Sequence, residues 1–472
     1  MTLPRSEIES ASGWGVVVLS EAVAGAVGFV VLIHMARVLG PASFSNVEYA
    51  GVFAGLMLVW VRGGVESIAH REAARRPSLI APLSEALALV KIGLAAAGFG
   101  VIAIFATISD RSRLPIVLAS GLILVPSALS LDVGPRALGR FRLLAMIQVV
   151  RTLALAGLVW LLVAGPTDGA IAAGCVVAAE TASMLVFGFI HVARNGWPRV
   201  RPRWRAARAI ASRGAVASLG RFGRVFLYAA DLVILGTFWS EADLGPYAAS
   251  RRVVFALVAV ALAVPAAVAP PLASLWAKGR DEFRDRLSRI TTSLMGPALA
   301  ASFGLVLTAR GWMAFLFGSE YERGWPSLAL IAARLPVLLL AAISTAALVA
   351  IRRERESARI VATACALAIV AVPLSAWQFG PMGAAWAMIA IEGVVAGLGW
   401  SSLRRFGAGP SWSIVEPTDL IAVAAMSAVV VACSGLPVWV TSTLGASTFG
   451  IVRAITSGWF ASRGLAPSEA AR

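Results

Sequence analysis

Charged residues are scarce in this sequence. They make up 14% of its 472 residues, whereas 59% are hydrophobic. A chain so poor in charge cannot fold in water without exposing a large apolar surface, and this excludes a soluble globular protein. The chain is therefore expected to be covered by lipid.

Cysteine and histidine are rare as well, with three of each. Cys175, Cys365 and Cys433 lie in apolar segments at unrelated spacings, which favours neither a disulfide framework nor a metal site. The sequence also has no phosphate-binding loop of the form G-x-x-x-x-G-K-[ST] and no G-x-S-x-G nucleophile turn. These absences predict a protein that is not an enzyme and that needs no cofactor.

What the sequence does have is a succession of apolar runs of about 20 residues, the length that a helix needs to cross a bilayer. Residues 86–105 are apolar throughout except for Lys91, so they lack the alternation of a membrane β-strand. The first run is expected to stay on the mature chain as a helix. The pattern predicts an all-α polytopic membrane protein with 13 or 14 helices, at residues 15–35, 47–69, 86–108, 114–131, 143–164, 170–192, 215–239, 246–276, 291–309, 328–351, 360–377, 384–403, 420–436 and, less regularly, 438–460.

The formal net charge of +16 comes from basic residues that cluster in alternate loops. These loops include residues 71–76, 136–142, 194–213, 278–289, 352–355 and 404–405, and the loops between them are nearly bare of basic residues. Basic loops mark the cytoplasmic side of a membrane protein. The charge therefore indicates topology rather than nucleic-acid binding.

The longest basic segment, residues 194–213, is expected to be a cytoplasmic linker between two halves. The predicted organisation is a six-helix lobe at 1–193, the linker at 194–213, a second six-helix lobe at 214–405, and one or two further helices with a tail at 406–472. The two halves resemble each other in sequence: "SNVEYAGV" and "DLGPYAAS" each follow the first helix of a half, and they place Tyr49 and Tyr247 at equivalent positions. Duplicated helical units are a common way to build a transporter with a site between two lobes.

Six segments, taken in their order and spacing, resemble the oligosaccharide-lipid flippases of the Wzx type, in the superfamily that also holds the MATE drug exporters and the lipid II flippase. They are "ARVLGPASF", "RGGVESIAHREAARR", "YAADLVILGTFWSEADLGPYAASRRV", "PLASLWAKGRDEF", "FLFGSEYERGWPSLALIAA" and "QFGPMGAAWAMIAIEG". The resemblance implies two six-helix bundles in a V-shaped arrangement in the bacterial cytoplasmic membrane. It also implies a polyprenyl-diphosphate-linked oligosaccharide as substrate, moved outward by alternating access. Membrane lipids and the polymerase and glycosyltransferases of the same polysaccharide pathway are the further partners to expect.

Ionisable residues inside the predicted helices are the candidates for function. An Arg, Lys or Asp at the centre of a membrane helix costs roughly 2.5 to 3.5 kcal/mol, so most of these side chains must face one another or water. A polar cavity is therefore predicted, and arginines in excess of acids would bind a diphosphate through paired N–H donors. The candidates are Arg62, Glu66, Lys91, Arg151, Glu180, Arg221, Arg224, Asp231, Arg251, Arg252, Arg334 and Glu392.

Structural roles compete with this interpretation for several candidates. Arg224 and Asp231 are seven residues apart on one helix face and would form an ion pair within the membrane. Arg251 and Arg252 stand near the start of a helix, where an interfacial position is as reasonable as one in the cavity. Lys91 lies near a helix start and would reach the membrane surface with its long side chain.

Two other functions compete with the flippase. A MATE-like cation-coupled antiporter usually places a carboxylate deep in its first bundle, and the first helix here offers only Glu21. A membrane-embedded polymerase or glycosyltransferase would need a large external loop or a cluster of catalytic carboxylates, and the sequence contains neither. An interior rich in arginine favours an anionic substrate, and so the flippase.

Overall fold

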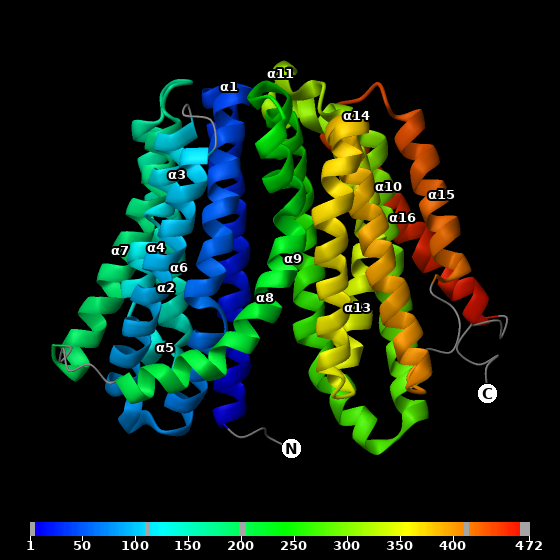
Figure 1. The fold of residues 1–472 in the computed structure, drawn as a ribbon. Helices are drawn as coiled ribbons and strands as arrows, with labels where there is room; N and C mark the ends of the chain where they lie inside the picture. The colour runs from blue at the N-terminus through cyan, green and yellow to red at the C-terminus, as the bar shows by residue number, and fades with distance from the viewer. Residues whose placement is uncertain (1–4, 109–112, 198–203, 410–414, 463–472) are drawn as a thin grey trace. The chain divides into compact units, whose positions relative to one another are not determined.

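The computed structural model describes residues 5–108, 113–197, 204–409 and 415–462. Within these ranges the chain is helical, without a strand (Figure 1). Eight of the described helices are long and apolar enough to cross a membrane. This confirms the prediction of an all-α polytopic membrane protein. The central part of the predicted linker, residues 198–203, and the tail from residue 463 lie outside the described residues.

The predicted spans are helical apart from a few residues at their ends and at internal breaks. The first helices are α1 (Arg5–Arg75), α2 (Ile80–Ile108), α3 (Leu114–Gly121), α4 (Leu124–Leu129), α5 (Val133–Ala137), α6 (Phe141–Leu162), α7 (Gly169–Asn195) and α8 (Trp204–Phe238). The later helices are α9 (Glu241–Lys278), α10 (Arg280–Phe317), α11 (Ser319–Glu322), α12 (Trp325–Ala333), α13 (Leu335–Ala350), α14 (Glu354–Arg405), α15 (Pro417–Ala432) and α16 (Val438–Ser462).

Two of the expected loops are replaced by sharp kinks. Residues 36–46 and 378–383 were expected to separate spans, but α1 and α14 continue through them and bend at Gly40 (φ 70°) and Gly380 (φ 65°). Glycine adopts a positive φ without steric cost, and the proline that follows each glycine has a φ suited to the first turn of a helix. One helical segment therefore ends at each of these glycines and the next begins at the proline that follows, so that no loop separates the two segments.

Two other predicted spans are broken internally. The span at 114–131 is divided into α3 and α4, and the span at 328–351 is divided into α12 and α13. The second break lies at Arg334, two residues before Pro336, whose nitrogen cannot donate a helical hydrogen bond.

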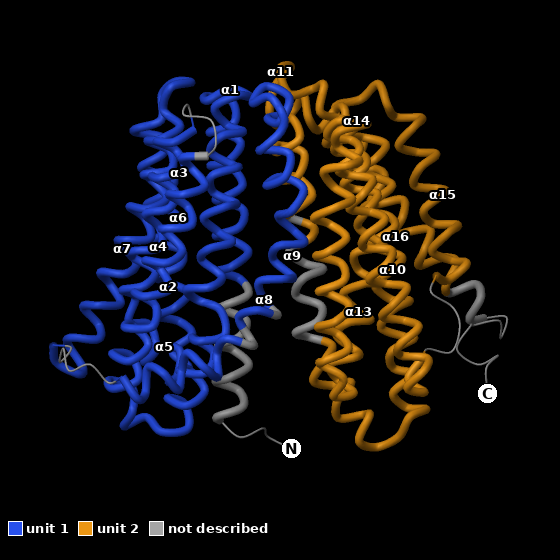
Figure 2. The backbone as a smooth tube through the Cα atoms, viewed as in Figure 1, with its two compact units in different colours: residues 1–245 blue, residues 246–472 orange. Residues whose placement is uncertain are grey.

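The chain forms two compact units, residues 1–245 and 246–472 (Figure 2). In unit 1, α8 packs closely on α1 at Gly214. A Cβ atom at this position would lie only 2.8 Å from the backbone of Val65, so the close approach requires glycine. In unit 2, the hairpin of α15 and α16 packs on α10. The lobe boundaries expected from the basic segment 194–213 stay a prediction.

Candidate functional site

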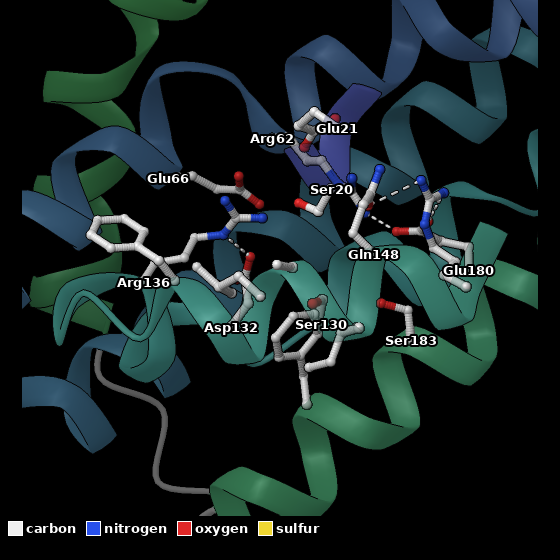
Figure 3. Close-up of a pocket in the computed structure, with 16 residues that line it drawn as sticks. Ser20, Glu21, Arg62, Glu66, Ser130, Asp132, Arg136, Gln148, Glu180 and Ser183 are labelled. Carbon is white, nitrogen blue, oxygen red and sulfur yellow. Dashed lines mark hydrogen bonds and ion pairs between the residues drawn. The ribbon is translucent and has the colours of Figure 1, made fainter. Parts of the chain in front are cut away.

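A cavity of about 250 Å³ lies inside unit 1 (Figure 3). Helices α1, α6 and α7 supply most of its lining, and the connection between α4 and α5 supplies the rest together with α5 itself. The charged and polar residues in the lining are Ser20, Glu21, Arg62, Glu66, Ser130, Asp132, Arg136, Gln148, Arg151, Glu180 and Ser183. The cavity thus collects ionisable groups that are separated by more than 150 positions in the sequence.

Glu180 on α7 joins two arginines at one end of this cavity. Its Oε1 atom pairs with Nη2 of Arg62 on α1, and its Oε2 atom lies 3.1 Å from Nη1 of Arg151 on α6. Two neutral side chains hold the arginines as well: Nε of Arg62 donates to Oγ of Ser127 at 2.5 Å, and Nη2 of Arg151 donates to Oε1 of Gln148 at 3.2 Å. The result is one carboxylate shared by two guanidinium groups.

The backbone of α1 breaks directly beside Arg62. Gly63 has non-helical angles (φ −44°, ψ −123°), and the freed N–H of Gly64 donates to Oγ of Ser218 on α8 at 2.8 Å. A side chain at Gly63 would meet Ser218 at 3.0 Å, so a larger residue would crowd the contact. Broken helices whose backbone groups are satisfied by neighbouring helices are tolerated in membranes next to polar cavities. The break therefore places Arg62 and Glu66 along the cavity wall.

Glu66, Asp132 and Arg136 line another part of the cavity, away from Glu180 (Figure 3). Nζ of Lys91, whose side chain is fully buried, lies 2.8 Å from Oε1 of Glu66. Nε of Arg136 lies 2.5 Å from Oδ2 of Asp132, and Nε2 of His70 lies 4.0 Å from the other oxygen of that carboxylate. Burial of Asp132 favours its neutral form, but the positive charges of Arg136 and Lys91 outweigh this and hold its pKa below the ordinary value.

The charges of the cavity are close to balance. Among the described lining residues, Arg62, Arg136 and Arg151 face the carboxylates of Glu21, Glu66, Asp132 and Glu180. Lys91 is paired just behind the wall. The described lining of this cavity thus has no excess of arginine over acid. The arginine-rich interior expected from the sequence stays a prediction.

The structure brings together only part of the candidate set. Arg62, Glu66, Lys91, Arg151 and Glu180 meet at the cavity. On α8, Arg221 and Arg224 are exposed, whereas Asp231 is buried. In unit 2, Arg251 and Arg252 are half-buried, and the guanidinium of Arg252 lies over the ring of Phe255. Arg334 and Glu392 form a separate buried pair there, with Nη2 2.6 Å from Oε1.

Sequence reasoning missed Asp132 and assigned Arg136 only to a basic loop. Their spacing of four residues in "DVGPR" was the available signal, because residues four apart on a helical turn are neighbours. The polar wall residues Gln148 and Ser183 carried no signal, since single neutral polar residues are common in membrane helices.

Helices long and apolar enough to cross a membrane, with a charged cavity among them, place the described part of the chain among the polytopic membrane proteins. The chain belongs to the polysaccharide biosynthesis protein family, whose model matches residues 34–326, more than half of its length. This confirms the resemblance found in the sequence. No curated protein matches the sequence.

Solved structures of transporters share the fold. The lipid II flippase MurJ in an inward closed conformation is similar with a TM-score of 0.73 and 10% identity, over 94% of this chain and 99% of that chain. An inward-facing multidrug resistance MATE family transporter of the MOP superfamily gives a TM-score of 0.62 and 14% identity, over 83% and 98%. A MOP superfamily transporter from Pyrococcus furiosus gives 0.53 and 12%, over 85% and 94%. At these identities the likeness concerns the fold.

Proposed function

We propose that this protein is a flippase that moves a polyprenyl-diphosphate-linked oligosaccharide outward across the bacterial cytoplasmic membrane during polysaccharide biosynthesis. The match to the polysaccharide biosynthesis family and the fold shared with a lipid II flippase support this function. The observation that carries it is the cavity of unit 1, where two partly exposed arginines share one carboxylate. Planar guanidinium groups bind phosphate oxygens through paired N–H donors.

Alternating access is the proposed mechanism. The division of the chain into two compact units supports it, because alternating access needs two bodies that can move against each other. Membrane lipids, the polymerase and the glycosyltransferases of the same pathway are the proposed partners. Serine and glutamine side chains in the cavity wall offer neutral hydrogen-bonding groups to parts of the substrate that carry no charge.

Lipid analysis of a deletion strain tests the function. Without the protein, the polyprenyl-diphosphate-linked oligosaccharide should accumulate on the cytoplasmic face, and a plasmid copy of the gene should reverse the accumulation. A plasmid that carries a variant with both Arg62 and Arg151 replaced by glutamine serves as the matched control and should leave the accumulation in place. Unchanged pools of lipid-linked sugar in the deletion strain would contradict the proposal.

A cation-coupled antiporter is the second candidate, favoured by one observation. Glu21 on the first helix lines the cavity together with three other carboxylates, an arrangement suited to cations. For this function, the deletion strain should become sensitive to cationic drugs while its lipid-linked sugars stay unchanged. The two candidates therefore predict opposite outcomes in the same strain.

A further inference from the structure

Glu180 differs from the other acids of the cavity in the number of cations that it holds. Each of its two oxygens pairs with a different arginine, Arg62 or Arg151. The side chain of Glu180 is only 9% exposed, whereas those of Arg62 and Arg151 are 36% and 30% exposed. The carboxylate is thus covered by the protein, while the two guanidinium groups remain open to the cavity.

The two arginines do not depend on Glu180 alone for their positions. Ser127 accepts a hydrogen bond from Arg62, and Gln148 accepts one from Arg151. A guanidinium has five N–H donors. Arg62 uses its Nε and Nη2 groups in the contacts made by described residues, which leaves the N–H groups of Nη1 for a further acceptor. Arg151 uses its Nη1 and Nη2 groups in such contacts, which leaves the N–H of Nε. Both arginines can therefore hold a second anion without a large rearrangement.

The charges at this end of the cavity leave a positive remainder. Two guanidinium groups and one carboxylate sum to one positive charge, which attracts a diphosphate less strongly than two unpaired arginines would. A transport site must bind well enough to capture its substrate and weakly enough to release it. A carboxylate that competes with the phosphate for the same N–H donors weakens binding and so favours release of the substrate.

We propose that Glu180 is the internal counter-ion of Arg62 and Arg151, the two arginines to which the proposed function assigns the diphosphate of the substrate. It occupies the two guanidinium groups when the cavity is empty and yields them to phosphate oxygens when the substrate enters. Glu180 is in this sense a positioning residue that sets the affinity of the site. The inference rests on the proposed function, since it assumes a substrate that carries phosphate.

Binding of inorganic pyrophosphate to the purified full-length protein in detergent tests the inference. Glu180→Gln removes the competing charge and should tighten binding by about tenfold or more, because the Coulomb attraction of both arginines is then unopposed. Glu72→Gln is the control: it removes a negative charge from α1 at a position outside the cavity lining, where Glu72 pairs with the exposed Arg76. This control should change the affinity by less than about threefold.

Arg151→Gln provides a second variant that does not rely on the folding of Glu180→Gln. It leaves Arg62 and Glu180 as a neutral pair, so binding of pyrophosphate should weaken by about tenfold or more. In cells, Glu180→Gln should slow oligosaccharide export at a normal protein level, because release becomes slow. Glu180→Asp keeps the charge and should restore most of the export.

The outcomes separate the inference from the proposed function. Equal pyrophosphate affinity of the wild type and Glu180→Gln would overturn the counter-ion role, even if the deletion strain accumulates lipid-linked oligosaccharide. An absence of pyrophosphate binding to wild type, Glu180→Gln and Arg151→Gln would overturn the diphosphate site in this cavity. A deletion strain with unchanged lipid-linked sugars would contradict the flippase function itself, whatever the binding experiment gives.

Discussion

Glu180 in unit 1 and Glu392 in unit 2 are both buried carboxylates that pair with arginine. Glu180 follows Gly169, the first residue of α7, by eleven positions, and Glu392 follows Pro381, the first residue after the kink of α14, by the same number. Both carboxylates are ion-paired, but Glu180 holds two arginines beside a cavity, whereas Glu392 holds Arg334 with side chains only 6% and 10% exposed. Glu180 therefore belongs to an open site in unit 1, and Glu392 to a closed pair in unit 2.

Breaking the closed pair should destabilise the protein. Arg334→Met leaves the buried carboxylate of Glu392 without its partner, and such a loss typically costs about 3 to 5 kcal/mol. The amount of monodisperse protein after detergent extraction and its melting temperature should both fall. The double variant Arg334→Met with Glu392→Leu removes both charges and should recover most of the loss. A single variant as stable as the wild type would contradict a structural role for the pair.

Gly296 on α10 leaves room for the buried carboxylate of Asp419 on α15, which pairs with Nε of Arg453 on α16 at 2.8 Å. Gly296→Ala would place a methyl group against this carboxylate, so it should lower stability by about 1 to 3 kcal/mol, although alanine is the better helix former. A melting curve in detergent measures the change. Gly304→Ala on the same helix is the matched control, because its methyl group would meet only Met426 at 3.9 Å. That variant should be neutral or slightly more stable, and equal effects of the two substitutions would refute the close approach.

Arg113 contacts three helices through residues that all belong to unit 1. Its Nη1 donates to the carbonyl of Gly236 on α8, its Nε lies 3.2 Å from Oε1 of Glu241 on α9, and its guanidinium lies over the ring of Tyr49 on α1. Arg113→Met should therefore lower the melting temperature, with a cost of about 2 kcal/mol or more for the buried carbonyl that loses its donor.

Arg310 provides the comparison for Arg113. It forms an ion pair of 2.5 Å with Glu322, but its side chain is 75% exposed. Arg310→Met should cost no more than about 1 kcal/mol, because exposed ion pairs contribute little. Melting curves of both variants in the same detergent decide the matter, and a larger loss for Arg310→Met would contradict the assignment of Arg113 as the connecting residue.

The orientation predicted by the basic loops can be tested with single cysteines. In a background in which the three natural cysteines are replaced by serine, cysteines at Lys278 and Arg355 should be shielded from a membrane-impermeant maleimide in intact cells. Cysteines at Ser240 and Ser319 should react. All four side chains are exposed at helix ends, so differences in labelling report the side of the membrane rather than burial. Labelling of Lys278→Cys in intact cells would contradict the predicted topology and place the basic loops on the external side.

The sequence alone determined the membrane class and the places of the helices. The length of an apolar run and the number of basic residues in a loop are local properties of the sequence. Membrane-crossing segments such as residues 170–192 could therefore be predicted directly from the chain. The kinks at Gly40 and Gly380 also had local signals, a glycine followed by a proline. Their effect was misjudged, because a run of polar or small residues looks like a loop until the geometry of the turn is known.

Only the tertiary structure decided which charges meet. Arg62 and Glu180 are 118 positions apart, and nothing in either local sequence indicates the other. The cost of an unpaired charge in a membrane requires that partners exist, but it does not select them. Selection depends on which helix faces pack together, and a helix that is apolar on every side carries almost no periodic signal for its orientation. The cavity of unit 1, and the sharing of Glu180 between Arg62 and Arg151, follow from that packing.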